Sequence, residues 1–527
     1  MRGALIGLAV LLVVAIGSAG YVYYVTHDLK RVDVRGLSGA LTQGQEAGTE
    51  NILLVGSTSR CALAAQSPAY GLCQGSADSA PVNGVNSDVI MILHAEPNRH
   101  RLALLSIPRD LFIPNARSTG ANNIDAGLDQ GLTQVVAAIE DDFGIPIQHA
   151  VSLNFDQFAN IVNALGGIDM SFPMSVFDWA PPPQGSSGLN VRAAKCVHLN
   201  GPQALEVVRA RHIRYEAAGS DPSDPYSWPQ EGLSDLARIR RDHEFLRVLA
   251  TAMAKKGLDN PITDINLINS VKSDLTFDQS WSVSDMADLV LDFHSIDINA
   301  VPQLTLPVAL VTDPDGPSGS YIFQGDGPYG DVEFPAQSTD QAVIDEVLGI
   351  GPTTDSMTGD PLPAPPSVTV SVMNGTGISD QAADTSASLA ALGFHTVGVG
   401  DTTPVGDVAE TFVYYGSHAA KIEAAAERVA RSMTGSVIMA YDPSQVTDGA
   451  EVTVATGTQF AVDSPRASPT VPTSGSSTPA PATTVPATSP ATAAIAAPSP
   501  ATSNLEPWDP QACPAGATAT ALVPNPT

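Results

Sequence analysis

The chain has 527 residues, with 25 basic and 55 acidic side chains and a net charge of −30. At roughly 150 residues per domain, this length predicts about three to four units and excludes a single small domain. So acidic a chain repels a phosphate backbone, which argues against sequence-independent binding to nucleic acid.

The N-terminal segment Gly3–Val25 carries no charged side chain and could span the roughly 30 Å hydrocarbon core of a bilayer as a helix. We therefore predict a membrane anchor over residues 1–25 and a juxtamembrane segment over residues 26–50. The small residues Gly17-Ser18-Ala19 leave a cleaved signal peptide as the alternative. Both interpretations export the rest of the chain, and the anchor predicts a single-pass protein of the cell membrane with its main domain outside the cytoplasm.

Three short apolar segments rich in branched residues are predicted to be buried strands: Asn51–Val55, Val89–Leu93 and Leu102–Ile107. The connection between the last two is short enough for a hairpin, which would make them antiparallel. If the first strand is also antiparallel to the second, one sheet edge collects Asp88, Arg109 and Asp110. A carboxylate and an arginine at one edge suit a metal ion and an anionic substrate. The alternative is that these strand ends only face water.

A group of arginines stands out in this acidic chain: Arg209, Arg211, Arg214, Arg238, Arg240 and Arg241. If the segment VVRARHI is extended, Arg209 and Arg211 point to the same side and could grip one pyrophosphate. Residues 233–256 are predicted to form a helix on which Arg238 and Arg241 share a face. Guanidinium groups make bidentate contacts to phosphate oxygens. The alternative is local ion pairing, for example between Arg238 and Asp242.

The remainder of the chain divides by composition. The main folded unit, predicted over residues 51–351, is followed by a Pro-rich linker over residues 352–366. Alternating strand and helix patterns then predict a small α/β domain over residues 367–460. Residues 461–527 are rich in Pro, Ala, Thr and Ser with few large apolar side chains, so we expect a disordered tail.

The four cysteines are consistent with disulfide formation in an oxidising environment. No spacing of Cys and His residues in the sequence matches a zinc site. Cys61 and Cys73 bracket a loop and are predicted to form a disulfide, with two unpaired thiols as the alternative. Cys196 and Cys513 are left without an assignment.

Six segments, in this order, resemble the LytR-CpsA-Psr family of cell-wall ligases: NILLVGSTSR (51–60), NSDVIMIL (86–93), LLSIPRDLFIP (104–114), residues 141–170, LNGPQALEVVRARH (199–212) and LSDLARIRRDHEFL (233–246). The segment at 370–394 resembles the LytR C-terminal domain that often accompanies this family.

The resemblance implies an α/β fold, with a three-layer α/β/α catalytic domain around a mixed central sheet, a small C-terminal α/β domain and a disordered tail. It implies a phosphotransferase that moves an anionic glycopolymer from a polyprenyl pyrophosphate carrier to peptidoglycan, assisted by Mg²⁺ or Mn²⁺. Its expected partners are the polyprenyl pyrophosphate-linked glycan, peptidoglycan and, through the N-terminal helix, the membrane, but no nucleic acid.

The residues that match the family's motifs receive roles by the same resemblance. Asp88 corresponds to a metal-associated aspartate. The expected pyrophosphate-binding residues are Arg109, Arg209, Arg211 and Arg238, to which we add Arg241 from the helical spacing. The expected catalytic residues are Arg109, Asp110 and Arg211.

Three positions depart from the family's pattern. Thr58 replaces a second metal-associated aspartate, Asn86 replaces an arginine and Asp242 replaces a glutamine. We hypothesise that the long loop before Asp88, pinned by the Cys61–Cys73 pair, supplies Asp78 as a substitute metal ligand. The alternative function is a non-catalytic protein that binds polyprenyl phosphate or wall glycan with a degenerate metal site. A transcriptional role is disfavoured by the charge and the predicted export.

Overall fold

The computed structural model describes residues 29–38, 48–57, 85–180, 186–232, 234–257, 275–293, 295–310, 321, 323, 327, 329, 332–406, 409–463 and 505–522. The predicted anchor at 1–25 and the positions Thr58, Cys61, Cys73 and Asp78 lie outside these residues. None of the helices that the structure describes is long and apolar enough to cross a bilayer.

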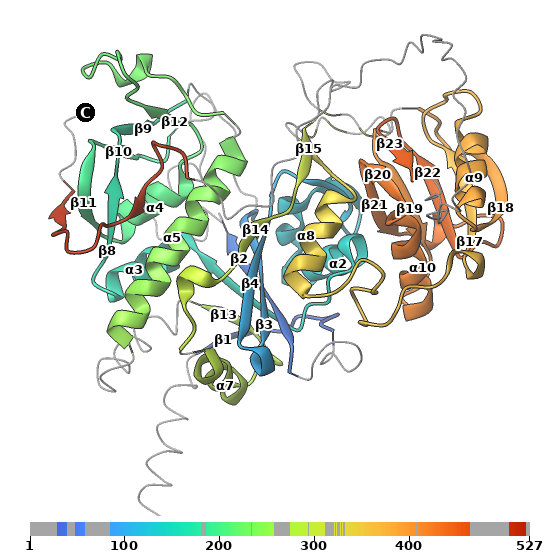
Figure 1. The fold of residues 1–527 in the computed structure, drawn as a ribbon, viewed down its shortest axis with the longest axis horizontal. Coiled ribbons are helices and arrows are strands. Elements are labelled where there is room, and N and C mark those ends of the chain that lie inside the picture. The colour runs from blue at the N-terminus through green and yellow to red at the C-terminus, as the bar shows by residue number, and fades with distance from the viewer. Residues whose placement is uncertain are drawn as a thin grey trace, which may run out of the picture.

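A seven-stranded sheet forms the centre of the main domain (Figure 1). In spatial order its strands are β1 (Lys30–Val32), β13 (Thr276–Asp278), β7 (His149–Asn154), β2 (Glu50–Ser57), β3 (Ser87–Glu96), β4 (Arg101–Ile107) and β14 (Gln303–Thr305). The predicted antiparallel hairpin of β3 and β4 is confirmed, and β2 is antiparallel to β3, as the predicted sheet edge required. Because β2 is parallel to β7 and β4 to β14, the sheet is mixed, as expected.

Helices cover both faces of this sheet. Leu53 and Val55 pack on one side against α2 (Leu132–Phe143) and α8 (Thr339–Leu348), in the largest apolar core. Ile52 points the other way, into a smaller cluster beside α7 (Val283–Phe293). The alternation follows from the period of two along a strand, and apolar side chains on both faces make β2 a buried central strand.

A second apolar core lies beside the sheet. It is built from α3 (Phe155–Ala164), α4 (Gly201–Arg209), α5 (Ser234–Gly257), β8 (Ile168–Phe172) and β11 (Ala194–Leu199). Capping boxes start α3 and α4: the Asn154 side chain accepts from the N–H of Gln157, and Asn200 does the same with Gln203.

Three small sheets complete the main domain. One has three strands, with β9 (Val176–Asp178) between β10 (Asn190–Val191) and β12 (Ile213–Tyr215). The other two are pairs, β5 (Phe112–Arg117) with β6 (Gly120–Asn123) and β15 (Val308–Leu310) with β16 (Glu333–Pro335).

The main domain starts earlier than predicted. β1 lies within the segment interpreted as juxtamembrane, yet it pairs with β13 at the edge of the central sheet. The side chain of Arg31 fixes it there by donating to the carbonyl of Asp278 at 2.9 Å. The pattern missed β1 because an edge strand of three residues has no periodicity long enough to detect.

The C-terminal domain contains a five-stranded sheet in the order β18 (His395–Asp401), β17 (Thr369–Asn374), β22 (Val452–Thr456), β19 (Thr411–Tyr415) and β21 (Val437–Tyr441). The helices α9 (Gln381–Ala391) and α10 (Ala420–Ala430) complete it. The predicted C-terminal α/β domain is confirmed.

The segment predicted as a linker is packed between the two domains. Ser356 is fully buried and donates through Oγ to Glu427 Oε1 on α10 at 3.0 Å. Asn115 of the main domain exchanges two hydrogen bonds with the backbone of Tyr441, at 3.0 Å each. The two domains therefore share a buried, hydrogen-bonded interface.

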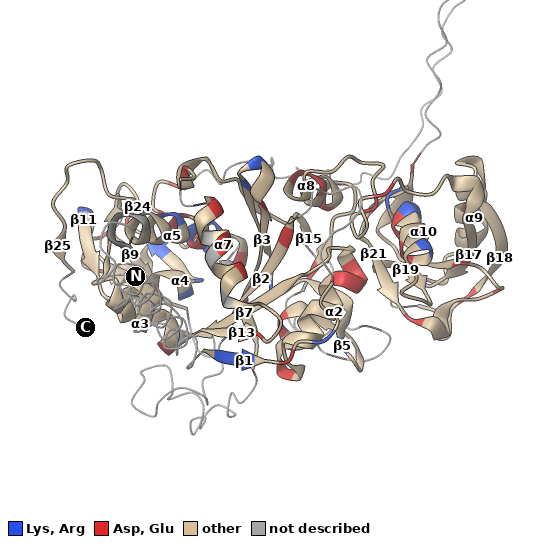
Figure 2. Ribbon diagram, turned by 90° about the horizontal axis from the view of Figure 1, so that it is seen from below, with Lys and Arg blue, Asp and Glu red and all other residues tan. Residues whose placement is uncertain are grey.

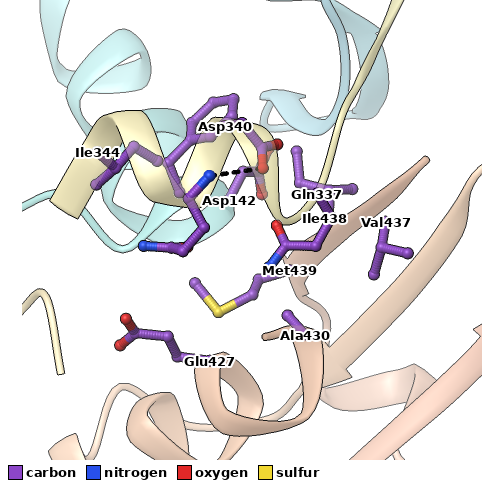
Figure 3. Close-up of a pocket in the computed structure, with 11 residues that line it drawn as sticks. Asp142, Gln337, Asp340, Ile344, Glu427, Ala430, Val437, Ile438 and Met439 are labelled. Atoms are coloured by element: carbon purple, nitrogen blue, oxygen red, sulfur yellow. Dashed lines mark hydrogen bonds between the residues drawn. The ribbon is translucent and has the colours of Figure 1, made fainter. Parts of the chain in front are cut away.

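A cavity of about 20 Å³ lies in this interface between α2, α8 and the C-terminal domain (Figure 3). This is room for about one water molecule. Three acidic side chains line it, namely Asp142, Asp340 and Glu427. Burial, the largest cause, raises the pKa of Asp340 and of Glu427 to about 7, and that of Asp142 well above its usual range.

The expectation of disorder after residue 460 is wrong for residues 505–522. This segment, which we call the C-terminal strap, adds β24 (Gln511–Ala512) to β8 and β25 (Thr520–Ala521) to β11. Figure 1 shows it in dark red beside these strands, on the opposite side of the main domain from the C-terminal domain. Cys513 of the strap forms a disulfide with Cys196 of β11. The composition of this segment did not predict its ordered structure, because the residues that hold it in place lie more than 260 positions away in the sequence.

Candidate functional site

The predicted sheet edge forms as expected. Ser57 at the end of β2 pairs with Ser87 at the start of β3, and Ile90 pairs with Ile107 at the end of β4. Asp88, Arg109 and Asp110 therefore lie at one edge of the sheet.

Arg109 is the centre of the cluster. Its Nη1 donates to Asp88 Oδ1, and its Nε lies 3.2 Å from Asp110 Oδ1. Asp125 and Asp235 each have a carboxylate oxygen 3.8 Å from the same guanidinium group. Burial lowers the pKa of Arg109, but these four carboxylates outweigh it and raise the pKa above its ordinary value.

Two further arginines reach the cluster from other elements. Arg211, just before β12, places Nη2 2.9 Å from Asp110 Oδ2 and Nε 3.6 Å from Asp235 Oδ1. Arg238 on α5 places Nη2 2.8 Å from Asp235 Oδ1 and donates to the carbonyl of Asp88 at 2.6 Å. Asp110 bridges Arg109 and Arg211, so it orients both guanidinium groups. In Figure 2 blue segments mark basic residues on α4 and α5.

The backbone that carries Arg211 is held by a buried carboxylate. Asp178 Oδ1 accepts from the N–H of Arg211 at 3.2 Å and from the N–H of His212 at 2.7 Å. The predicted extended conformation from Arg209 to Arg211 is wrong, because Arg209 is the last residue of α4. Arg209 lies near Glu206. Burial raises the pKa of the Glu206 carboxyl group above its ordinary value, and the positive charge of Arg209 offsets part of this rise.

Arg241 is not part of this cluster. Its side chain is fully buried, Nη1 donates to Glu231 Oε2 at 2.7 Å, and Nη2 donates to the carbonyl of Ala210. We therefore leave Arg241 out of the pyrophosphate site.

The cluster holds more carboxyl groups than guanidinium groups. Asp88, Asp110, Asp125, Asp235, Asp242 and Glu333 surround Arg109, Arg211 and Arg238. Burial is the largest cause of raised pKa values among these acids: about 7 for Asp125, about 7 for Asp242 and about 8 for Glu333. Carboxyl groups in this range can exchange protons at neutral pH.

The sequence pattern missed three members of the cluster. Asp235 carried a usable signal, because it lies three residues before Arg238 on one helix face. Asp125 belongs to a 3₁₀ segment, Ile124–Gln130, and Glu333 to the short strand β16. Neither has a local signature, since tertiary contacts alone bring them to the site.

Two of the departures from the family pattern can be located. Asn86 donates through Nδ2 to Asp125 Oδ2 at 3.1 Å, so it orients a carboxylate where an arginine would add positive charge. Asp242 Oδ2 lies 3.9 Å from Arg238 Nε, which confirms the predicted local ion pair. The hypotheses on Thr58, Asp78 and the Cys61–Cys73 disulfide fall outside the described residues.

The cluster contains carboxylate oxygens, the ligand type that a divalent cation such as Mg²⁺ prefers. Both carboxylate oxygens of Asp235 are buried without a well-aligned hydrogen bond, although Oδ1 is close to Arg238. Oδ1 also lies 3.6 Å from Arg211 Nε and 3.8 Å from Arg109 Nε, so three guanidinium groups surround this carboxylate. Within the described residues, no group of three or more His, Cys, Asp or Glu side chains forms a ready-made metal site. Mg²⁺ commonly binds through one or two carboxylates together with substrate phosphates and water, which this arrangement permits.

His243 is a buried structural residue. Its Nε2 lies 2.7 Å from Ser106 Oγ, and burial lowers its pKa to about 4. It is therefore neutral at neutral pH.

Comparison with protein families decides the classification. The model of the LytR_cpsA_psr family matches residues 23–331, more than half of the chain. The chain belongs to the LytR-CpsA-Psr family. A second model, described as LytR cell envelope-related transcriptional attenuator, matches residues 367–460, the C-terminal domain.

Individual relatives are distant. The chain is 27% identical over 289 residues to the "Probable cell wall biosynthesis protein LcpB" of Corynebacterium glutamicum, covering 54% of this chain and 60% of that protein. It is 31% identical over 128 residues to the polyisoprenyl-teichoic acid–peptidoglycan teichoic acid transferase TagV of Bacillus subtilis, covering 24% of this chain and 32% of that one. Among solved structures, a LytR-Csp2A-Psr enzyme from Actinomyces oris is similar with a TM-score of 0.44 and 22% identity, over 60% of this chain and 95% of that chain. The matched regions thus span only part of the curated relatives.

Proposed function

We propose that this LytR-CpsA-Psr protein is a phosphotransferase that attaches an anionic glycopolymer, carried on polyprenyl pyrophosphate, to peptidoglycan. The convergence of Arg109, Arg211 and Arg238 from three separate elements carries the proposal. Guanidinium groups make bidentate contacts to phosphate oxygens, so three of them close together suit a pyrophosphate. The name of the relative TagV, a teichoic acid transferase, supports the same reaction class.

In the proposed reaction, an acceptor hydroxyl attacks the glycan-bearing phosphorus and the phosphoanhydride bond breaks. Polyprenyl phosphate leaves with the electron pair of that bond, and the proton of the acceptor hydroxyl passes to water or to the departing phosphate. Arg109 and Arg211 would stabilise the charge that develops on the phosphate oxygens, and Asp110 would hold the two guanidinium groups at fixed spacing. Mg²⁺ or Mn²⁺, held by Asp88, would neutralise the pyrophosphate when bound.

We further propose that the catalytic domain lies outside the cytoplasm, on a protein held in the cell membrane by its N-terminal segment. The apolar run Gly3–Val25 supports this location. The disulfide between Cys196 and Cys513 supports it independently, because such bonds persist mainly in oxidising compartments.

The test is turnover by the full-length protein in detergent, with geranylgeranyl pyrophosphate as donor and water as acceptor, followed as released phosphate. We expect turnover that depends on Mg²⁺ and that Arg211→Ala lowers by about 100-fold or more. Arg214→Ala is the matched control, because Arg214 lies three positions away but donates to the Trp228 carbonyl at 2.9 Å, outside the cluster.

Equal loss in Arg211→Ala and Arg214→Ala would contradict the proposed role of the cluster. Binding of the donor without turnover in the wild type would favour the alternative, a non-catalytic binding protein.

A further inference from the structure

The C-terminal strap is attached to the part of the main domain that carries the arginines. β24 and β25 pair with the two outer sides of the β8–β11 pair, and Cys513 is bonded to Cys196. The N–H of Ala512 donates to Glu244 Oε1 on α5 at 2.7 Å. The strap is therefore joined to α5 and to the sheet by backbone pairing and a covalent bond.

Two side chains of the strap reach into this part of the domain. The ring of Trp508 stacks on Tyr215 with a centroid distance of 3.9 Å and an interplanar angle of 5°. Its Nε1 donates to Glu231 Oε2 at 3.3 Å. Asp509 is fully buried, and its Oδ2 accepts from Arg240 Nε at 2.6 Å.

Asp509 belongs to a buried network that ends at the site. Its Oδ1 lies 3.6 Å from Arg241 Nη1, the same atom that donates to Glu231. Arg241 Nη2 donates in turn to the carbonyl of Ala210, the residue before Arg211. Asp178 holds the N–H groups of Arg211 and His212 from the other side. The backbone that carries Arg211 is thus fixed at consecutive peptide groups.

The strap supplies one of the two negative charges in this network. Arg240 and Arg241 are two cations, and Glu231 and Asp509 are the two carboxylates that face them. The side chains of Arg241, Glu231 and Asp509 are at most 1% exposed. Removing one partner from a buried ion pair leaves an uncompensated charge that the surroundings must rearrange to accommodate. Without Asp509, Glu231 would be shared between two arginines.

We propose that the C-terminal strap completes the active site: Asp509, acting through Arg241 and the carbonyl of Ala210, positions Arg211 against Asp110. Asp509 and Arg241 are positioning residues, since neither reaches the cluster itself. The inference rests on the proposed function for its catalytic consequence, but the positioning of Arg211 can be measured without turnover.

The experiment is a double-mutant cycle in the full-length protein with Asp509→Asn and Arg211→Ala. The first readout is kcat for hydrolysis of geranylgeranyl pyrophosphate. We expect Asp509→Asn to lower kcat by about 10- to 100-fold in the wild type, as expected when a distant change misplaces a catalytic group. In the Arg211→Ala background it should have no further effect, because its target is gone.

Asp345→Asn is the matched control. Asp345 accepts from Arg431 Nη1 and Nη2 at 2.9 Å each, in a mostly buried pair at the other end of the main domain. Its effect on kcat should be the same factor with and without Arg211. If Asp509→Asn also acts by the same factor in both backgrounds, the strap only stabilises the fold and the proposal is wrong. If Asp509→Asn does not fold, Cys513→Ser removes the covalent bond to the strap with Asp509 intact and is used in the same cycle.

The second readout separates this inference from the proposed function. The affinity for inorganic pyrophosphate is measured by calorimetry on the same four proteins. If the wild type has no turnover but Asp509→Asn weakens pyrophosphate binding only when Arg211 is present, the positioning role stands and the phosphotransferase assignment falls. Additive effects on affinity would overturn the positioning role, whatever the turnover.

Discussion

Replacement of Asp340 by Asn tests whether the ionised side chain of this residue, buried in the domain interface, destabilises the folded protein. Asp340 lies on α8, lines the interface cavity and accepts from the N–H of Gln341 at 2.7 Å, the contact drawn in Figure 3. Burial raises its pKa from 3.8 to about 7. The folded protein therefore binds this proton more tightly than the unfolded chain does.

The size of the effect follows from that difference in pKa. A shift from 3.8 to about 7 is roughly 3 units, and each unit corresponds to about 1.4 kcal/mol. Stability from this group is fully present below pH 4 and is lost as the pH rises through about 7. Asn cannot ionise and keeps an acceptor for Gln341, so Asp340→Asn should be more stable than the wild type at pH 8, by up to about 4 kcal/mol.

Thermal unfolding of both proteins at pH 5 and pH 8 measures this difference. At about 2–4 °C per kcal/mol, Asp340→Asn should melt about 8–16 °C higher than the wild type at pH 8, and the difference should be less than half as large at pH 5. Asp129→Asn is the control for a loss of one exposed carboxylate, since its side chain is 48% exposed in its pair with Arg117. Identical pH profiles for wild type and Asp340→Asn would refute the reasoning.

Two further predictions concern the main domain. The double variant Cys196→Ser with Cys513→Ser should lower the free energy of unfolding by about 2–4 kcal/mol, because the disulfide closes a loop across a sequence separation of 317 residues. Chemical denaturation measures this change, and an unchanged denaturation midpoint would contradict it. Gly201→Ala should cost about 2–3 kcal/mol or more, because the added Cβ would lie 2.0 Å from the carbonyl oxygen of Ala159 and force α3 and α4 apart. A thermal shift that matches Gly219→Ala, a positive-φ glycine with open space around it, would argue against this close contact.

Local patterns predicted the central strands and much of the site. The run NILLV and the two strands after it are apolar, short and bounded by turns, so their existence and the hairpin of the last two followed from the sequence. The antiparallel pairing of the first two was an assumption, which the structure bears out. Their register then brought Asp88, Arg109 and Asp110 to one edge, as expected. The ion pair of Arg238 with Asp242 was equally local, since residues four apart face each other on a helix.

Helical spacing was a poor guide to what each arginine contacts. Arg238 and Arg241 are three residues apart on α5, yet one reaches Asp88 and Asp235 while the other turns to Glu231 and Ala210. Spacing predicts a shared face and not the neighbours that this face meets. The extended conformation proposed for Arg209 failed for a related reason, because the capped helix α4 continues through it.

The amino-acid sequence by itself determined the family, the mixed α/β architecture, the separate C-terminal domain and the sheet edge that carries Asp88, Arg109 and Asp110, because each depends on periodicity or on short motifs. Only the tertiary structure decided which charged side chains from distant segments meet. Glu333 and Asp509 reach the main domain's buried carboxylate and arginine networks from segments without a motif, and Cys513 pairs with Cys196 across 317 positions. Contacts between residues so far apart in the sequence produce no periodic pattern in it. They form only because the packed domain brings the two segments together.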